Sequence, residues 1–417
     1  MPSASCRPSR PSMQPGAYRR CRAPTCNGWG GPPMRDASAL YVLPALKALR
    51  VDDGQVVLTR KFVEGAAEYA QRWNGPVVVC MHEADARDGN LDHVPWRPED
   101  LPFEFRWLSR DPHAVARTID DARVVLGSLV HQHADLPDLC RQADVPLVLV
   151  SEYSLKTRRQ VIRTETANPV VRWRRNWWTT QLERRHERSV RLAAGVQCNG
   201  TPTYQAYQSL SPNPLLYFDS RVGTDMLVDQ AALAQRVDSL RKNEPLRLAF
   251  SGRLIAMKGA DHLPVVAAEL RRLGVPFRMT ICGAGEQEPL IRELVTRHDL
   301  GERVRLAGVL DFRTELLPFI AGDVDVFVCC HRQGDPSCTY LETMSCGTPI
   351  VGYDNEAFEG VVQHSKAGWL TPLDQPRALA ARIAELDRDR SGIARAAHAA
   401  REFAAAHTFD RTMDVRV

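Results

Sequence analysis

Residues 331–351 read HRQGDPSCTYLETMSCGTPIV and directly follow the apolar run VDVFVCC at 324–330. The apolar run predicts a buried strand. The pair Asp335-Pro336 predicts the start of a helix, because Asp caps helix N-termini and Pro suits the first helical position. The Gly-Thr-Pro triplet that begins at Gly347 ends this helix and precedes a second short apolar strand. Strand, helix and strand in this order are one unit of a parallel α/β sheet.

The same alternation of apolar runs and amphipathic stretches extends from residue 39 to the C-terminus. It is typical of parallel sheets covered by helices on both faces. A polar stretch at 220–245 divides the chain, so we expect two doubly wound, Rossmann-like α/β units that face each other across a cleft. Their expected bounds are 39–225 and 243–395, and a helix at 396–417 is expected to return to the N-terminal unit. The expected strands are 40–43, 56–58, 76–80, 124–126, 147–150, 196–198, 246–251, 278–282, 304–307, 324–329 and 350–352, and the expected helices are 63–73, 136–143, 177–192, 260–273, 287–298, 315–321, 339–345 and 377–386.

Length and composition limit the possible classes of protein. A chain of 417 residues with 44% hydrophobic and 25% charged residues has a globular composition and is too long for one ordinary core. No stretch reaches the ~18–20 consecutive apolar residues of a membrane span, so we do not expect an integral membrane protein. The net charge of +4 is too small to indicate a nucleic-acid partner, and we expect none.

The first 38 residues differ in composition from the rest. They carry six Arg, one Asp and seven Pro and lack an apolar stretch, so they do not form a secretory signal. We expect a disordered basic tail at 1–38, with a transit peptide or a later start at Met34 as alternatives. The 11 Cys are an odd number, and most lie in apolar runs, such as Cys80 and Cys329. This indicates reduced, buried thiols in a cytoplasmic protein rather than disulfides.

The loop after the strand at 246–251 has the composition of a phosphate site. It reads GRLIAMKG from Gly252 and leads into a helix. Glycines let the backbone approach a ligand, and a helix start favours an anion. Arg253 and Lys258 add two cations, which suits a diphosphate. The alternative is a basic surface loop.

Two further motifs are weaker. Gly283-Ala284-Gly285 follows a strand but lacks the third glycine of a dinucleotide fingerprint, so a dehydrogenase is not indicated. Asp323-Val324-Asp325 has the spacing of a metal-binding Asp pair. Because it opens an apolar strand, we interpret these carboxylates as caps and turn formers.

Glu342 lies three residues after Thr339 in the expected helix, so both side chains share one face. A carboxylate there can hold the two hydroxyls of a ribose. Together with the loops from Gly252 and Gly283, this segment resembles the retaining group 1 glycosyltransferases (family 4) of GT-B fold. These share a Gly-Arg-Leu…Lys-Gly loop, a Gly-x-Gly turn and a Glu-x7-Glu element followed by Met-Ala-Cys-Gly-x-Pro-Val-Val. The resemblance covers 246–375 well and 40–220 loosely.

This resemblance implies a site for a UDP- or GDP-sugar as co-substrate, without a cofactor or a metal. Arg253 and Lys258 would bind the donor diphosphate, together with the helix start at Asp335–Ser337. Glu342 would hold the ribose. Val309 and Leu310 would lie beside the base. The residues expected to contact the nucleotide sugar are Gly252, Arg253, Lys258, Gly283, Gly285, Val309, Leu310, Ser337, Cys338, Thr339 and Glu342.

The chain departs from the family at the first Glu of the Glu-x7-Glu element, which would fall on Gly334. In the family this Glu contacts the donor sugar. Asp335 is the nearest carboxylate, one residue later. Either Asp335 takes over the contact, or the sugar is held differently, or transfer is impaired. We favour a variant subgroup with a shifted contact.

A candidate acceptor side follows the strand at 124–126. The segment SLVHQHADLP starts at Ser128, and only one of His131 and His133 would face a ligand if the strand continued. By resemblance the second one, His133, would lie near the donor sugar's reaction centre. The alternative is a solvated His pair. The family's glycine-rich acceptor loop is not evident at 60–65, and the loop at 82–92 is an acceptor candidate by position only.

Residues 156–191 carry eleven Lys or Arg and three Glu, a net charge of +8, together with Trp173, Trp177 and Trp178. Basic residues interspersed with Trp are typical of segments that lie on an anionic membrane surface. The alternatives are a basic helix whose Trp side chains pack on the core, and a nucleic-acid face.

Together with these patterns, the resemblance implies a retaining transferase that moves a hexose from a UDP- or GDP-sugar to a hydroxyl acceptor. The acceptor would be a lipid-linked or surface polysaccharide precursor, and the protein would be cytoplasmic, at the inner membrane face. Two alternatives remain. One is a nucleotide-sugar-binding protein with impaired catalysis, and the other is a GT-B-like nucleotide-sugar 2-epimerase.

Overall fold

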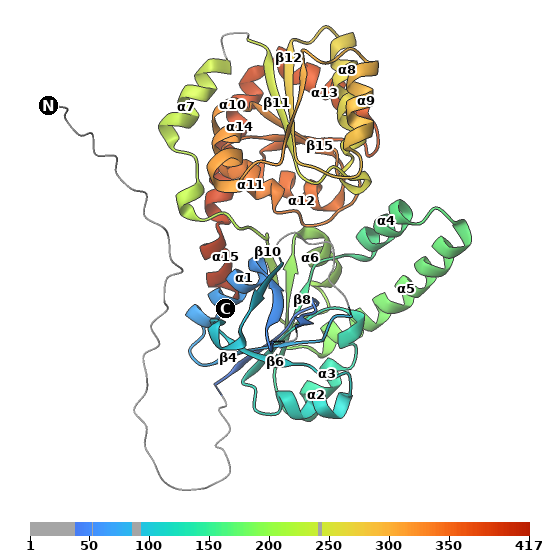
Figure 1. Ribbon diagram of the computed structural model, residues 1–417, viewed down its shortest axis with the longest axis vertical. Helices are drawn as coiled ribbons and strands as arrows, with labels where there is room; N and C mark the ends of the chain where they lie inside the picture. The colour runs from blue at the N-terminus through green and yellow to red at the C-terminus, as the bar shows by residue number, and fades with distance from the viewer. Residues whose placement is uncertain (1–37, 52, 86–92, 241–243) are drawn as a thin grey trace, which may run out of the picture. The chain divides into compact units, whose positions relative to one another are not determined.

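The computed structural model describes residues 38–51, 53–85, 93–240 and 244–417, which form two α/β units with helices on both sides of each sheet (Figure 1). The predicted tail apart from Ser38, residues 86–92 of the candidate acceptor loop and residues 241–243 of the predicted junction lie outside the described residues. None of the described helices is long and apolar enough to cross a membrane. The helices are α1 (Arg60–Arg72), α2 (Pro112–Ile119), α3 (Leu136–Gln142), α4 (Leu155–Glu165), α5 (Pro169–Leu192), α6 (Thr201–Tyr207), α7 (Gln230–Ser239), α8 (Leu263–Arg272), α9 (Glu288–Arg297), α10 (Leu317–Asp323), α11 (Thr339–Ser345), α12 (Glu356–Ser365), α13 (Pro376–Arg388), α14 (Arg390–Ala406) and α15 (Phe409–Arg416).

The N-terminal unit contains a parallel sheet with the strand order β10-β9-β8-β7-β1-β4-β6. Leu40 of β1 pairs with Val77 of β4 on one side and with Val124 of β7 on the other. The chain therefore reverses its direction of winding at β1, and the carboxyl ends of β1 and β7 flank a position where such sheets bind ligands. The strands are β1 (Leu40–Leu43), β4 (Val77–Met81), β6 (Glu104–Trp107), β7 (Val124–Ser128), β8 (Leu147–Ser151), β9 (Gly195–Asn199) and β10 (Pro214–Tyr217).

The C-terminal unit repeats this arrangement with the strand order β13-β12-β11-β14-β15-β16. Here the reversal lies between β11 and β14, where Leu248 pairs with Val326. The loops that follow these two strands are the Gly252 loop and the loop from Cys330 to Cys338, so the topology brings the two predicted donor segments to one sheet edge. The strands are β11 (Leu246–Ser251), β12 (Phe277–Cys282), β13 (Val304–Gly308), β14 (Val326–Cys329), β15 (Ile350–Tyr353) and β16 (Gly368–Thr371).

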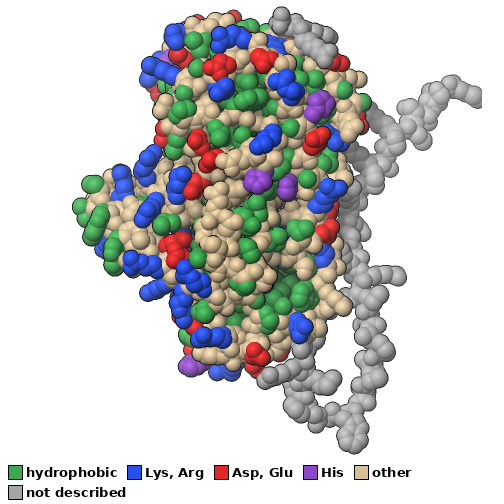
Figure 2. All heavy atoms as spheres, turned by 180° about the vertical axis from the view of Figure 1, so that it is seen from behind, with side chains coloured by type: hydrophobic (Ala, Val, Ile, Leu, Met, Phe, Trp, Pro, Cys, Tyr) green, Lys and Arg blue, Asp and Glu red, His purple; other side chains and the backbone are tan. Residues whose placement is uncertain are grey.

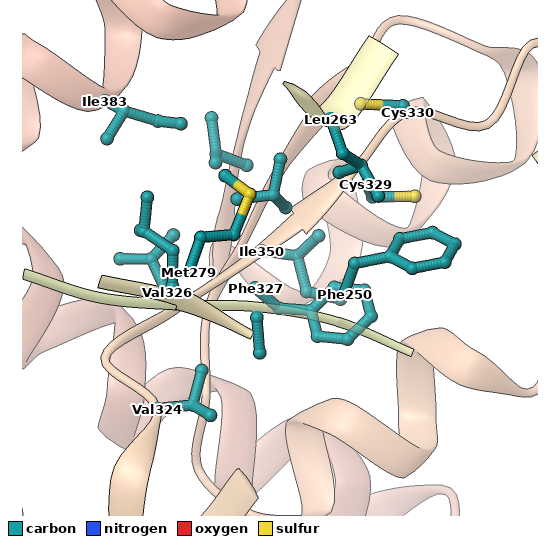
Figure 3. Close-up of a cluster of buried hydrophobic side chains, with 14 of the residues drawn as sticks. Phe250, Leu263, Met279, Val324, Val326, Phe327, Cys329, Cys330, Ile350 and Ile383 are labelled. Carbon is teal, nitrogen blue, oxygen red and sulfur yellow. The ribbon is translucent and has the colours of Figure 1, made fainter. Parts of the chain in front are cut away.

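The core of the C-terminal unit fixes this edge. Phe250 of β11 and Phe327 of β14 stack with ring centroids 6.1 Å apart, and Met279 and Ile350 of the neighbouring strands lie beside them (Figure 3). All four side chains are at most 1% exposed. Burying side chains of this size stabilises a fold by ~1.5–3 kcal/mol each, so the strands that carry the site loops are strongly held.

The structure corrects three predicted elements. The run at 56–58 belongs to β3 (Val56–Thr59), which pairs antiparallel with β2 (Leu49–Arg50) and β5 (His93–Trp96) in a small separate sheet. The helix predicted from Trp177 begins at Pro169, because Asn168 accepts hydrogen bonds from the first-turn backbone. A π-helical turn occupies 312–316, so the helix predicted at 315–321 is displaced to α10.

The last two helices contact different units. Phe403 and Ala404 of α14 belong to the core of the C-terminal unit. Met413 of α15 is buried in the core of the N-terminal unit. The Arg416 guanidinium lies over the Tyr217 ring at 4.1 Å. The C-terminal segment therefore ties β10 of the first unit to the second unit.

Candidate functional site

The glycines of the two donor-side turns pack backbone against backbone. Gly283 donates to the Gly308 carbonyl (2.6 Å), and Gly252 donates to the Cys282 carbonyl (3.1 Å). Gly283 has a φ of +128°, and a Cβ there would lie 1.9 Å from the Gly252 oxygen. A Cβ on Gly285 would lie 2.4 Å from the Leu254 oxygen. These glycines are thus required for loop–loop packing, and contact with a ligand remains a prediction.

Lys258 is the central cation of the site. It ends a 3₁₀ turn (Ala256–Lys258), and Gly259 continues in the left-handed region, where a Cβ would lie 2.1 Å from the Cys330 oxygen. This close approach seats Lys258 against the loop after β14. Its side chain is buried, and Nζ donates to Asp335 Oδ2 (2.9 Å) and to Ser337 Oγ (3.5 Å). Three predicted site residues therefore meet.

Asp335 is an ion-pair partner and not the helix cap that the sequence predicted. Helix α11 starts at Thr339, with Cys338 as its N-cap residue. Burial raises the pKa of Asp335, but the Lys258 ammonium, together with His331 and hydrogen bonds, lowers the pKa overall. A charge-assisted bond to a buried ammonium is stronger than a cap, which explains the difference. Asp335 Oδ1 is buried and has no hydrogen-bond partner.

Gly334 is held by helix α4 of the N-terminal unit. Its N–H donates to Gln160 Oε1 (2.9 Å), and its carbonyl accepts from Thr157 Oγ1 (3.1 Å). A Cβ on Gly334 would lie 3.0 Å from Thr157 Oγ1 and 3.2 Å from Cβ of Glu356. The Glu356 carboxylate accepts from Ser154 Oγ (2.7 Å) and Thr157 Oγ1 (3.1 Å). Neighbouring side chains therefore fill the space beside Gly334.

Glu342 is buried on α11, and its carboxylate has a partner that the sequence did not reveal. Arg221 Nε donates to Glu342 Oε1 at 2.6 Å, and its guanidinium lies 3.6 Å from the centroid of the Phe312 ring. Val309, predicted to lie beside the base, is 73% exposed, and Leu310 packs against the core. Arg221 lies 121 positions from Glu342, so no local motif could have indicated the pair.

A second cluster joins the two units near the start of α11. Cys338 Sγ donates to Asp219 Oδ2 (3.1 Å), and Lys61 Nζ donates to both groups at 3.3 Å. Burial raises the pKa of the Cys338 thiol, and the Asp219 carboxylate adds to this effect. Burial, reinforced by Asp219, also raises the pKa of the nearby Glu152 carboxyl. The sequence predicted a nucleotide contact for Cys338 and missed Lys61, Glu152 and Asp219.

A pocket of about 450 Å³ opens at the carboxyl ends of β1, β4, β6 and β7. Both His131 and His133 line it, because the strand ends at Ser128 and the two residues lie in a 3₁₀ turn. The condition for only one of them to face a ligand, a strand that continues through both, is therefore not met. His133 Nδ1 lies 3.1 Å from the Ser128 carbonyl, and burial lowers its pKa to about 4. The described contacts do not join His133 to Lys258.

Asp325 forms an ion pair with Arg247, which differs from the cap or turn role that the sequence predicted for Asp323 and Asp325. Its carboxylate accepts from the Arg247 side chain (2.7 Å) and backbone N–H (2.9 Å). Asp323 lies 3.9 Å from the same guanidinium. Over the described residues, no three or more His, Cys, Asp or Glu side chains form a group that could hold a metal ion. Cys80 and Cys329 are buried free thiols, as predicted.

Part of the chain matches a known protein family. Residues 233–403 match the family model described as "Glycosyl transferases group 1". The C-terminal unit therefore resembles the group 1 glycosyltransferases. The chain is 32% identical over 155 residues to the putative colanic acid biosynthesis glycosyltransferase WcaL of Salmonella typhimurium, covering 34% of this chain and 36% of the relative. The chain therefore matches about a third of that relative's length.

Other similarities extend over more of the chain. The alpha-D-kanosaminyltransferase of Streptomyces kanamyceticus is 24% identical over 66% of this chain and 73% of its own length. The crystal structure of Anabaena Alr3699/HepE in complex with UDP matches 91% of this chain and 98% of that chain, with a TM-score of 0.62 and 16% identity. The fold of the chain is therefore the GT-B fold of two Rossmann-like domains, as the sequence predicted.

Proposed function

We propose that the chain is a retaining hexosyltransferase that uses a nucleotide-diphosphate sugar and a hydroxyl acceptor. The observation that carries this proposal is the buried Lys258 ammonium, held by Asp335 beside Ser337 at the edge where β11 and β14 end. Arg253 is exposed on the same loop and supplies a second cation. Two cations at this edge can offset the charge that develops on a leaving diphosphate, without a metal.

Two carboxylates would orient the donor. Glu342 would bind the ribose hydroxyls, with Arg221 fixing the position of its carboxylate. Asp335 would accept a hydrogen bond from a sugar hydroxyl through Oδ1, the oxygen that has no partner in the structure. In this way Asp335 would replace the Glu that the family has at the position of Gly334. The remaining oxygen of Asp335 would keep Lys258 in place.

The pocket of the N-terminal unit would receive the acceptor. His133 directs Nδ1 to the Ser128 carbonyl and is neutral because burial lowers its pKa to about 4. Its Nε2 can therefore accept a hydrogen bond from an acceptor hydroxyl. Attack would occur on the face of the sugar that the diphosphate leaves, which retains the anomeric configuration. Exclusion of water from the closed site would prevent hydrolysis of the donor.

The comparisons support the donor class but not one base or sugar. The Anabaena structure contains UDP, whereas a Mycobacterium tuberculosis relative, 28% identical over 42% of this chain, is named as GDP-mannose-dependent. The names of the Salmonella and Erwinia amylovora relatives refer to colanic acid and amylovoran biosynthesis, which supports a glycan or lipid-linked acceptor. We therefore propose a UDP- or GDP-hexose as donor and a polysaccharide precursor as acceptor.

Donor turnover by site variants tests this proposal. We expect Arg253→Ala to lower turnover of the matching UDP- or GDP-hexose by about 100-fold, because one charge on the leaving group is lost. Because Arg253 is exposed, this variant should fold normally. We expect Glu342→Ala to raise the KM for the donor about tenfold. Arg297→Ala on the exposed side of α9 is the control. Unchanged turnover in both site variants would refute the site.

A second pair of variants tests the shifted sugar contact. Asp335→Asn should reduce turnover by about 100-fold, and adding Gly334→Glu to it should not restore activity. The space at Gly334 is already filled by Thr157 and Glu356, so the new carboxylate could not reach a sugar bound beside Lys258. Recovery of activity in the double variant would contradict the role of Asp335. Donor binding without turnover by the parent chain would favour a binding protein, and epimerised donor without acceptor would favour an epimerase.

A further inference from the structure

The first half of helix α5 presents an apolar surface that nothing in the described structure covers. Trp173 is 70% exposed and Trp177 is 57% exposed, and Val170 on the same face is 72% exposed. Buried side chains of α5 begin only at Thr179. The alternative that these Trp side chains pack on the core is therefore wrong. Helices α4 and α5 extend away from the sheet of the N-terminal unit, and this apolar surface lies at their far end (Figures 1 and 2).

The same helix carries an excess of positive charge. Residues 156–191 have eleven Lys or Arg against three Glu. One of these, Glu183, is buried and paired with Arg158. Figure 2 shows Lys and Arg side chains gathered along the projecting hairpin, next to the hydrophobic tip. Arg184 and Arg185 are exposed two turns beyond Trp177 on α5. A surface of this kind is complementary to one that is both apolar and anionic.

We propose that the α4–α5 hairpin (residues 155–192) docks on an anionic lipid bilayer. The Trp and Val side chains would enter the boundary between headgroups and acyl chains, while the Arg side chains would bind lipid phosphates. Exposed aliphatic side chains such as Val170 and Val171 add nothing to stacking on bases, so a membrane fits the surface better than a nucleic acid. This docking does not depend on the proposed transfer reaction.

The docking surface adjoins the pocket proposed for the acceptor. The ring of Trp178 packs edge-on against the ring of His131, with centroids 5.7 Å apart, and His131 lines the pocket. The first half of α5 thus ends beside a residue that lines this pocket. If the proposed function holds, the acceptor would be a lipid-anchored glycan that reaches the pocket from the membrane.

Vesicle sedimentation with the full chain tests the docking. We expect binding to vesicles of 30% phosphatidylglycerol in phosphatidylcholine, weak binding to pure phosphatidylcholine, and release at high salt. Arg184→Gln/Arg185→Gln should weaken binding about 30-fold, since each basic residue near an anionic surface contributes about fivefold. Trp173→Ser/Trp177→Ser should weaken it roughly tenfold or more. The matched controls, Arg292→Gln/Arg297→Gln and Leu273→Ser/Leu290→Ser, change exposed residues of the C-terminal unit and should bind like the parent.

Several results would overturn the docking. These are no binding by the parent chain, equal binding to both vesicle types, or unchanged binding by the Trp variant. Light scattering tests whether a second copy of this chain, rather than a membrane, covers the surface. In that case the parent chain would be a dimer and the Trp variant a monomer. Transfer to a water-soluble acceptor should be unaffected in all four variants. Absence of that transfer by the parent chain would refute the proposed function. It would leave the conclusion from vesicle binding unchanged.

Discussion

At Gly283 the backbone after β12 approaches the Gly252 carbonyl so closely that no side chain fits between them. We expect Gly283→Ala to destabilise the chain by at least ~2 kcal/mol, because a Cβ would lie 1.9 Å from that oxygen and φ is +128°. Gly301→Ala is the matched control, since its Cβ would meet nothing within 4 Å. Urea unfolding measures the free energy of unfolding of both variants. Equal stability of the two variants would show that the loops can separate without cost.

The sequence predicted which residues meet at the candidate donor site better than it predicted how they contact one another. Lys258 and Asp335 could be singled out because both loops have recognisable composition and follow strands. Their ion pair could not be predicted, because Asp335-Pro336 is also a good helix start. Only the tertiary structure brings the Lys258 ammonium within 2.9 Å of the Asp335 carboxylate. Arg221 and Asp219 were missed for a related reason. Each meets its partner across more than 100 positions, and such contacts leave no local pattern.

Helix α4 holds the loop that contains Gly334. Thr157 and Gln160 make one hydrogen bond each to the Gly334 backbone. We expect Thr157→Val/Gln160→Leu to raise the KM for the donor about 30-fold. Each lost hydrogen bond makes the ordered conformation of the loop less favourable by about 1 kcal/mol. Hydrogen exchange should become faster at 333–338. Arg159→Gln, which lies on α4 but contacts Thr180 instead, is the control. An unchanged KM in the double variant would mean that the loop is ordered by Lys258 alone.

Elements were predictable where burial gives them a clear pattern. The central strands β1 and β11 have the predicted bounds, because both are mostly apolar and mostly buried beneath helices. Strand β3 is equally apolar but pairs antiparallel outside the main sheet, and composition does not distinguish the two. The first half of α5 was missed as a helix because its exposed Val and Trp side chains give no amphipathic periodicity.

The whole molecule should be sensitive to mild acid because its units bury neutral histidines. Burial lowers the pKa of His133 to about 4 and of His331 to about 3. Burial, helped by the charge of Arg158, lowers that of His186 to about 3. An unfolded chain takes up these protons below pH ~6.5, whereas the folded chain does not until pH 3–4. The unfolded state then binds more protons, so stability falls as the pH drops from 7 toward 4.

Each such histidine contributes a slope of about 1.4 kcal/mol per pH unit between these limits, so the three together predict a steep loss of stability between pH 6.5 and 5. Urea unfolding across this range measures the slope. His186→Gln should reduce the slope by about one third, even if it lowers stability at pH 7, because one proton no longer distinguishes the two states. His398→Gln, on the exposed face of α14, should keep the parent slope. A flat profile in the parent chain would mean that these histidines gain protons without unfolding, through local opening of the core around them.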